Sequence, residues 1–144
     1  MDLKLIYKNL YAKRQEALSG ACASKQLAIT EAFRIKWQQV VSASKIRHTK
    51  PKGWVVADWD TKEAFNKWGA YPYDAIFTRK MSKPNQPLLD ITILYNSDTK
   101  DYTPCHGGVR MKDRCKTTKE AAEIAEAWAA QFMKDNHESY SSIR

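Results

Sequence analysis

The sequence predicts an α+β protein in which a basic N-terminal helical hairpin precedes an α-β-β-β-α unit with a three-stranded antiparallel sheet. Three observations lead to this fold class. Apolar residues recur at helical spacing through the first fifty positions, strand-like segments begin after residue 53, and an alanine-rich helical segment follows them. A chain of 144 residues, 43% of them hydrophobic, can bury a core, and we expect a hairpin over residues 1–50 and a second domain over residues 54–144.

Two amphipathic helices account for the hairpin. The first is predicted from Asp2 to about Leu18, because its apolar positions share one helical face: Leu3, Ile6, Leu10 and Ala17. Ser19-Gly20 supplies a stop, and Ser24 is a suitable N-cap for a second helix that reaches about Ser44. The apolar face of the second helix consists of Ile29, Phe33, Trp37, Val40 and Val41.

A basic segment follows the hairpin. Residues 45–53 contain five basic side chains, counting one histidine, together with a proline and a glycine, which predicts an exposed linker and a domain boundary. Next, Trp54 to Ala57 has the composition of a short buried strand. An N-cap at Asp60 or Thr61 then predicts a short helix that ends near Gly69.

Three strands are predicted for the sheet. The segment from Tyr73 to Lys80 is strand-like, and a segment with two prolines interrupts it. The strongest strand signal is Leu88 to Tyr95, which is rich in β-branched residues. A poorer third strand is expected between Tyr102 and Lys112, interrupted by Gly107-Gly108.

The last helix is predicted from Lys119 to about Lys134, with Thr117 or Thr118 as its cap. Basic side chains precede it and enter its first turn: Arg110, Lys112, Arg114, Lys116 and Lys119. Backbone N–H groups at a helix start, reinforced by basic side chains, form a site suited to a phosphate. The alternative is a strand edge that charge protects from pairing with other chains.

The net charge of +8 is concentrated in the first third of the chain. Residues 1–53 hold eleven Lys and Arg against three acidic residues, whereas residues 54–144 carry thirteen of each sign. Such asymmetry points to a polyanionic partner, of which nucleic acid is the commonest, because lysine and arginine that neutralise phosphates release condensed counterions. The alternative is that the surplus serves solubility.

Residues 58–134 resemble a double-stranded-RNA-binding domain, through a short helix, three strands and a last helix that opens Thr-Thr-Lys-Glu-Ala-Ala-Glu-Ile-Ala-Glu-Ala-Trp. The resemblance implies that Lys119, with Lys116 upstream, contacts phosphates and that the loop from Met81 to Pro87 probes the minor groove. The end of this segment, a glycine-containing strand followed by a Thr-Lys-Glu-Ala-Ala helix, is similar to the three-strand-plus-helix DNA-binding domains of integrases and plant ethylene-response factors. Both resemblances point to nucleic acid.

Two other chemistries compete with this interpretation. Cys105, His106 and Cys115 are three possible zinc ligands, but no C-x-x-C pair accompanies them. Asp58 and Asp60 end an apolar run, where two carboxylates could hold a divalent cation for a nuclease, although helix capping explains them as well. We find no catalytic-triad spacing or glycine-rich phosphate loop, and therefore expect no enzyme activity, metal or cofactor.

The favoured function is noncatalytic binding of RNA or DNA through a basic surface. The expected phosphate contacts come from two segments: Lys45, Arg47, Lys50, Lys52, Arg110, Lys112, Arg114, Lys116 and Lys119. Further candidates, if the hairpin faces the same way, are Lys4, Lys8, Arg34 and Lys36.

A second hypothesis is a small protein that binds and inhibits another protein, as the defence inhibitors of phages and mobile elements do, and a metal-dependent nuclease is the third. The chain has no apolar run of bilayer-spanning length, so we expect no membrane association. Its three cysteines have no disulfide-framework spacing, which favours a cytoplasmic location.

Overall fold

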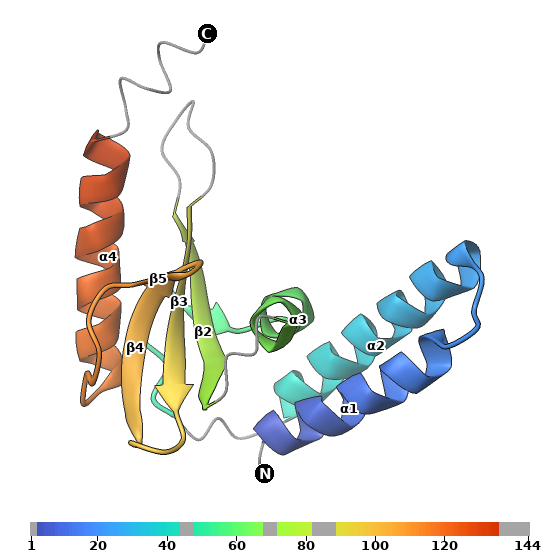
Figure 1. The fold of residues 1–144 in the computed structure, drawn as a ribbon. Coiled ribbons are helices and arrows are strands. Elements are labelled where there is room, and N and C mark those ends of the chain that lie inside the picture. The colour runs from blue at the N-terminus through green and yellow to red at the C-terminus, as the bar shows by residue number, and fades with distance from the viewer. Residues whose placement is uncertain (1–2, 44–47, 68–71, 82–88, 136–144) are drawn as a thin grey trace, which may run out of the picture.

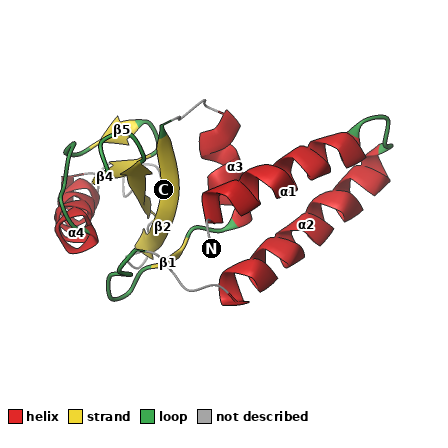
Figure 2. Ribbon diagram, turned by 90° about the horizontal axis from the view of Figure 1, so that it is seen from below, coloured by secondary structure: helices red, strands yellow, loops and turns green. Residues whose placement is uncertain are grey.

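A computed structural model describes residues 3–43, 48–67, 72–81 and 89–135. It confirms the α+β class and the N-terminal hairpin, with α4 on one face of a sheet and α3 and the hairpin on the other (Figures 1 and 2). Within the described residues, no helix has both the length and the apolar character to cross a membrane. The elements are α1 (Leu3–Leu18), α2 (Ala23–Ala43), β1 (Val55–Val56), α3 (Trp59–Lys67), β2 (Tyr73–Met81), β3 (Leu89–Asn96), β4 (Asp101–His106), β5 (Val109–Arg110) and α4 (Thr118–Asp135).

The described sheet has five antiparallel strands in the order β1-β2-β3-β4-β5, so the predicted count of three is wrong. The first addition is β1, where Val55 and Val56 pair with β2: the strand-like composition of Trp54 to Ala57 is confirmed, although the count of three did not include it and Val55 is exposed. The second arises because the predicted third strand turns back at Gly107, whose φ of 56° suits a tight turn, and becomes β4 and β5. A strand of two residues is too short to show the alternation of apolar and polar residues that distinguishes a strand from a loop.

The α4 face of the sheet forms the larger core. Ile91 and Ile93 of β3 are fully buried there, beneath the small side chains of Ala121, Ala125 and Ala129. Alternation along β3 points these isoleucines to one face, and alanines let the helix approach the sheet closely. Burying a large aliphatic side chain contributes about 1.5–3 kcal/mol, so this core supplies much of the stability of the fold.

The opposite face of the sheet is covered differently along its length. Near α3, Leu94 and Cys105 are buried beside Phe65. Further along the strands the same face turns polar, with Thr78 opposite Thr92 and Lys80 opposite Asp90.

The hairpin packs on α3. Tyr7, Leu10 and Trp37 of the hairpin form a buried cluster with Trp59 of α3. The Trp37 indole N–H donates to the Ala57 carbonyl at 3.3 Å, which ties α2 to the segment between β1 and α3. The apolar faces predicted for both helices therefore do meet, and they extend onto α3.

Two predictions about the connecting segments need correction. The cap of α3 is Asp58, whose Oδ1 accepts the Thr61 N–H at 2.8 Å, so the predicted cap at Asp60 or Thr61 is wrong. Residues 48–53 are mostly exposed, as predicted for the linker, but they also contact the second domain: His48 Nδ1 lies 2.9 Å from the Tyr102 hydroxyl and the Thr118 hydroxyl donates to the Thr49 carbonyl.

Candidate nucleic-acid interface

The start of α4 is capped by its own side chains. The Glu120 N–H donates to the Thr117 hydroxyl at 3.1 Å, while Glu120 Oε2 accepts the Lys116 N–H at 3.2 Å, a variant of the capping box. Lys112 Nζ donates to Glu120 Oε1 at 3.1 Å, and this bond, with the Lys116 N–H, lowers the pKa of Glu120. The Glu120 carboxylate and the Thr117 hydroxyl therefore take up two of the N–H groups around the helix start, and the backbone site expected for a phosphate stays a prediction.

Two of the basic residues before α4 are engaged in contacts with other side chains. Arg110 reaches across β4 and β3, and its guanidinium donates to the Tyr73 hydroxyl at 2.7 Å with its centre 5.3 Å from the ring. Arg110 also lies 3.9 Å from Asp113, and Lys112 is paired with Glu120 as described above. Neither cation is therefore placed to act as an unpaired phosphate contact.

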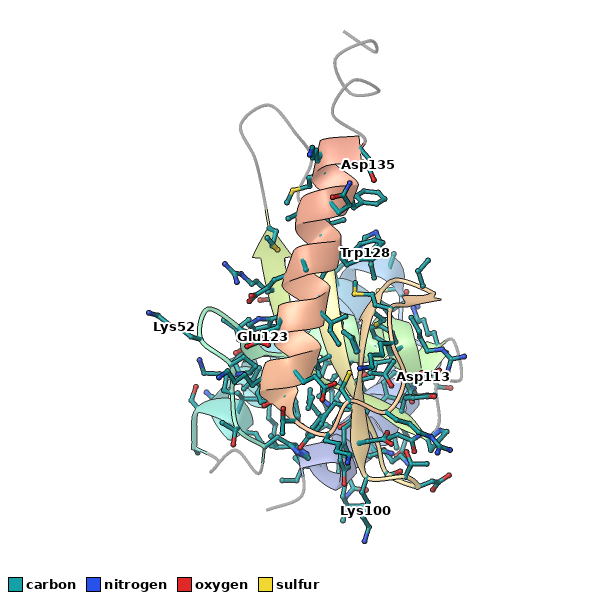
Figure 3. The ribbon with its side chains drawn as sticks, turned by 90° about the vertical axis from the view of Figure 1, so that its left-hand side faces the viewer. Lys52, Lys100, Asp113, Glu123, Trp128 and Asp135 are labelled. Carbon is teal, nitrogen blue, oxygen red and sulfur yellow. The ribbon has the colours of Figure 1, made fainter. Side chains whose placement is uncertain are left out.

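A second group of basic residues meets on the other flank of α4. Figure 3 shows Lys52 and Glu123 on one flank and Asp113 on the opposite flank. Between residues 49–53 and the first turns of α4 lies a groove of about 360 Å³, which we call the basic groove, and Lys50, Lys52 and Lys119 line it. These lysines come from two segments that are far apart in the chain.

The wall of the basic groove is held by an ion pair. Arg79 of β2 pairs with Glu126, whose Oε1 also accepts the Trp54 indole N–H at 2.9 Å. Gly53 precedes Trp54 with a φ of 84°, a backbone conformation that favours glycine. Arg79 was not among the predicted site residues, since nothing near it in sequence shows that it meets α4.

The charge of the basic groove is positive. Its lining includes Lys50, Lys52 and Lys119 with the carboxylates of Glu123 and Glu126, a formal balance of three against two. Arg79 already compensates Glu126, and Lys50 Nζ donates to the Trp54 carbonyl at 3.0 Å. Within the part of the chain that the structure describes, neither Lys52 nor Lys119 forms an ion pair, so both ammonium groups are available to an anion.

The nine predicted contacts thus fall into separate groups. Lys50, Lys52 and Lys119 come together in the basic groove, whereas Arg110 and Lys112 do not line this groove and have contacts of their own. Arg114 and Lys116 are exposed in the turn before α4, where Arg114 has a φ of 61°. Two predicted contacts lie outside the described residues: Lys45 and Arg47.

The basic residues of the hairpin do not join the basic groove, because the hairpin lies beyond the other face of the sheet (Figure 2). Arg34 bonds Glu31 and Asp60, each at 3.0 Å. The other hairpin candidates also belong to α1 or α2: Lys4, Lys8 and Lys36.

The alternative metal and nuclease residues have structural contacts. Asp58 caps α3 and Asp60 pairs with Arg34. Cys105 and Cys115 are fully buried free thiols, and burial raises the pKa of Cys105 to about 12. Across the described ranges, no three His, Cys, Asp or Glu side chains gather closely enough to hold a metal ion.

Comparison with protein-family models, curated proteins and solved structures gave no match to this chain. The resemblance to nucleic-acid-binding domains therefore stays a prediction. Its proposed minor-groove loop, from Met81 to Pro87, lies outside the described residues apart from Met81.

Proposed function

We propose that this chain is a noncatalytic nucleic-acid-binding protein whose phosphate contacts lie in the basic groove. The observation that supports the proposal is the meeting of Lys50, Lys52 and Lys119 beside the start of α4. An ammonium group binds phosphate as a point charge and carries no base information, so binding through this groove tolerates any sequence. Lys116 is also exposed, in the turn just before α4, and is a further candidate contact.

The proposal predicts a steep salt dependence. Each phosphate that a lysine neutralises adds about −0.9 to the slope of log K against log salt for duplex DNA. Lys52 and Lys119, which form no ion pair in the described chain, are the largest contributors, because an anion need not displace a carboxylate to reach them.

The decisive experiment is a fluorescence-anisotropy titration with labelled duplex RNA, duplex DNA and single strands between ~50 and ~200 mM salt. We expect the double variant Lys52→Glu/Lys119→Glu to bind about tenfold more weakly or worse and to reduce the salt slope by about two. The single variants Lys52→Glu and Lys119→Glu are each matched by Lys134→Glu, which makes the same charge change in the last turn of α4, roughly 22 Å along the helix from Lys119.

Circular dichroism checks that all variants are folded. Equal loss of affinity in Lys134→Glu and in the single variants Lys52→Glu and Lys119→Glu would show that only net charge matters. No binding of the unmodified chain to any of the probes at the lowest salt would refute the proposed function.

A further inference from the structure

The side of the molecule away from α4 carries a second, larger groove. It lies between one face of α2 and the start of α3, has a volume of about 750 Å³, and is called here the α2–α3 groove. The residues that carry the argument are Glu31, Arg34, Ile35 and Gln38 of α2 with Asp58 and Asp60 beside α3. None of its lining residues belongs to the basic groove.

The shape of the α2–α3 groove follows a helix. Its α2 residues recur every three or four positions from Glu31 to Ser42, which places them on one face over roughly 16 Å. The apolar stripe of α2 that packs inside the protein, which includes Phe33 and Trp37, is a different face. Ile35 lies on the groove face and is 53% exposed, so this face keeps an apolar side chain without cover from the described chain.

The charge of the α2–α3 groove is opposite to that of the whole chain. Glu31, Asp58 and Asp60 contribute three negative charges against the one positive charge of Arg34, a formal balance of −2 in a chain of +8. Arg34 is shared between Glu31 and Asp60, whose side chains stay 59% and 62% exposed. A polyanion is therefore repelled from this groove, while a cationic partner is attracted.

We propose that the α2–α3 groove docks a basic amphipathic helix of a partner protein. A helix laid along α2 matches the linear groove, in the way that amphipathic helices occupy grooves between helices. Its apolar residues, three or four positions apart, would cover Ile35, and its lysines or arginines would meet Glu31, Asp58 and Asp60. This interaction is separate from nucleic-acid binding, because it uses the other side of the sheet (Figure 1).

The test is site-specific photocrosslinking in cells that naturally make the chain. A p-benzoylphenylalanine residue replaces Gln38 in the groove, and the control places it at Asn9, an exposed position of α1 outside the groove. We expect adducts from position 38 and none from position 9. Mass spectrometry of the adduct should identify a partner segment with net positive charge and apolar residues at helical spacing.

Second substitutions then separate docking from nucleic-acid binding. Ile35→Asp and Glu31→Arg, introduced into the position-38 protein, should each reduce the adduct yield at least about fivefold and leave anisotropy titrations with nucleic acid unchanged. Lys52→Glu/Lys119→Glu should weaken the binding of nucleic acid and leave the adduct yield at position 38 unchanged. The two proposals can therefore fail independently of each other. An adduct with a second copy of this chain, with nucleic acid or with an acidic segment would overturn the inference, as would the absence of an adduct specific to position 38.

Discussion

The two interfaces that hold helices onto this protein are built from different side chains. Between α4 and the sheet, the buried contacts are those of aliphatic and aromatic side chains with alanines. Between the hairpin and α3, the aromatic cluster of Tyr7, Trp37 and Trp59 is accompanied by buried charges. Arg14 of α1 pairs with Glu63 of α3, linking the hairpin to the body of the protein.

This difference in side chains means that α4 and the hairpin are held in place by different forces. Apolar burial is strong but has little directional preference, so the α4 interface supplies stability. Ion pairs and hydrogen bonds at the hairpin have defined geometry: Lys62 Nζ lies 2.9 Å from Asp74 and 5.6 Å from the centre of the Tyr7 ring. Because desolvation offsets much of their attraction, these pairs fix the orientation of the hairpin more than they stabilise the fold.

The hairpin interface also contains buried polar atoms that have no hydrogen-bond partner in the described chain. Among the described residues, the Tyr7 hydroxyl and Arg14 Nε are buried without a hydrogen-bond partner. Burial is the main cause that raises the pKa of Tyr7 above its ordinary value, so the phenol stays neutral. We therefore expect the two interfaces to respond differently to substitution.

The largest effect is expected in the α4 core. Ile91→Ala removes a fully buried side chain and should lower the free energy of unfolding by about 4 kcal/mol, through lost burial and the cavity left behind. Urea denaturation measures this change in the free energy of unfolding. The matched control is Leu27→Ala on α2, where the side chain is 76% exposed and the change should stay within about 0.5 kcal/mol. Similar losses in both variants would contradict the assignment of stability to the α4 core.

A somewhat smaller effect is expected where the hairpin meets α3. Glu63→Gln leaves Arg14, whose side chain is 9% exposed, without its charge partner, which should cost about 3 kcal/mol. Hydrogen exchange should show the amides of α1 and α2 losing protection before those of β3. Glu123→Gln, an exposed change on α4, is the control, and equal loss of protection in the hairpin and in β3 would show that the two interfaces unfold as one unit.

The third prediction is a substitution that stabilises the protein. Tyr7→Phe removes a buried hydroxyl that has no partner in the described chain, and should raise the free energy of unfolding by about 1 kcal/mol. The pH dependence of the free energy of unfolding provides a second test of this variant. The pKa of Tyr7 is raised in the folded protein, so above about pH 10 the phenol ionises more readily in the unfolded chain than in the folded one. The free energy of unfolding of the unmodified protein should therefore fall as the pH rises above this value. The phenylalanine variant has no phenol to ionise at this position and should lose less stability in alkali. A destabilised Tyr7→Phe protein would reveal a bond to the hydroxyl.

The smallest effect concerns thiol reactivity. Cys22, exposed at the turn of the hairpin, has its pKa lowered chiefly by a hydrogen bond with Ser24, whereas burial raises the pKa of Cys105 and of Cys115. Titration with a chromogenic disulfide near neutral pH should therefore modify one thiol quickly and the other two only after denaturation. The Cys22→Ser variant should lose the fast phase, and a fast phase that persists would place an accessible thiol in the sheet.

The helices and strands were predicted correctly where their apolar pattern extends over many residues. The apolar faces of α1 and α2 and the β-branched run of β3 each repeat several times, so their periods identify them within one or two residues. The two-residue strands β1 and β5 give no such repeat. The buried pairs at the hairpin were also beyond prediction, because Arg14 and Glu63 are distant in the chain and each alone has the pattern of a solvated charge.

The sequence by itself determined the fold class, the helical hairpin and the surplus of positive charge, since these depend on composition and on local periodicity. Only the tertiary structure decided which charges act together. It brought Lys52 to Lys119, separated both from Lys112, and paired Arg110 with Tyr73 across the sheet. The physical reason is that charges interact through space, and the distances between them are set by the packing of helices on the sheet.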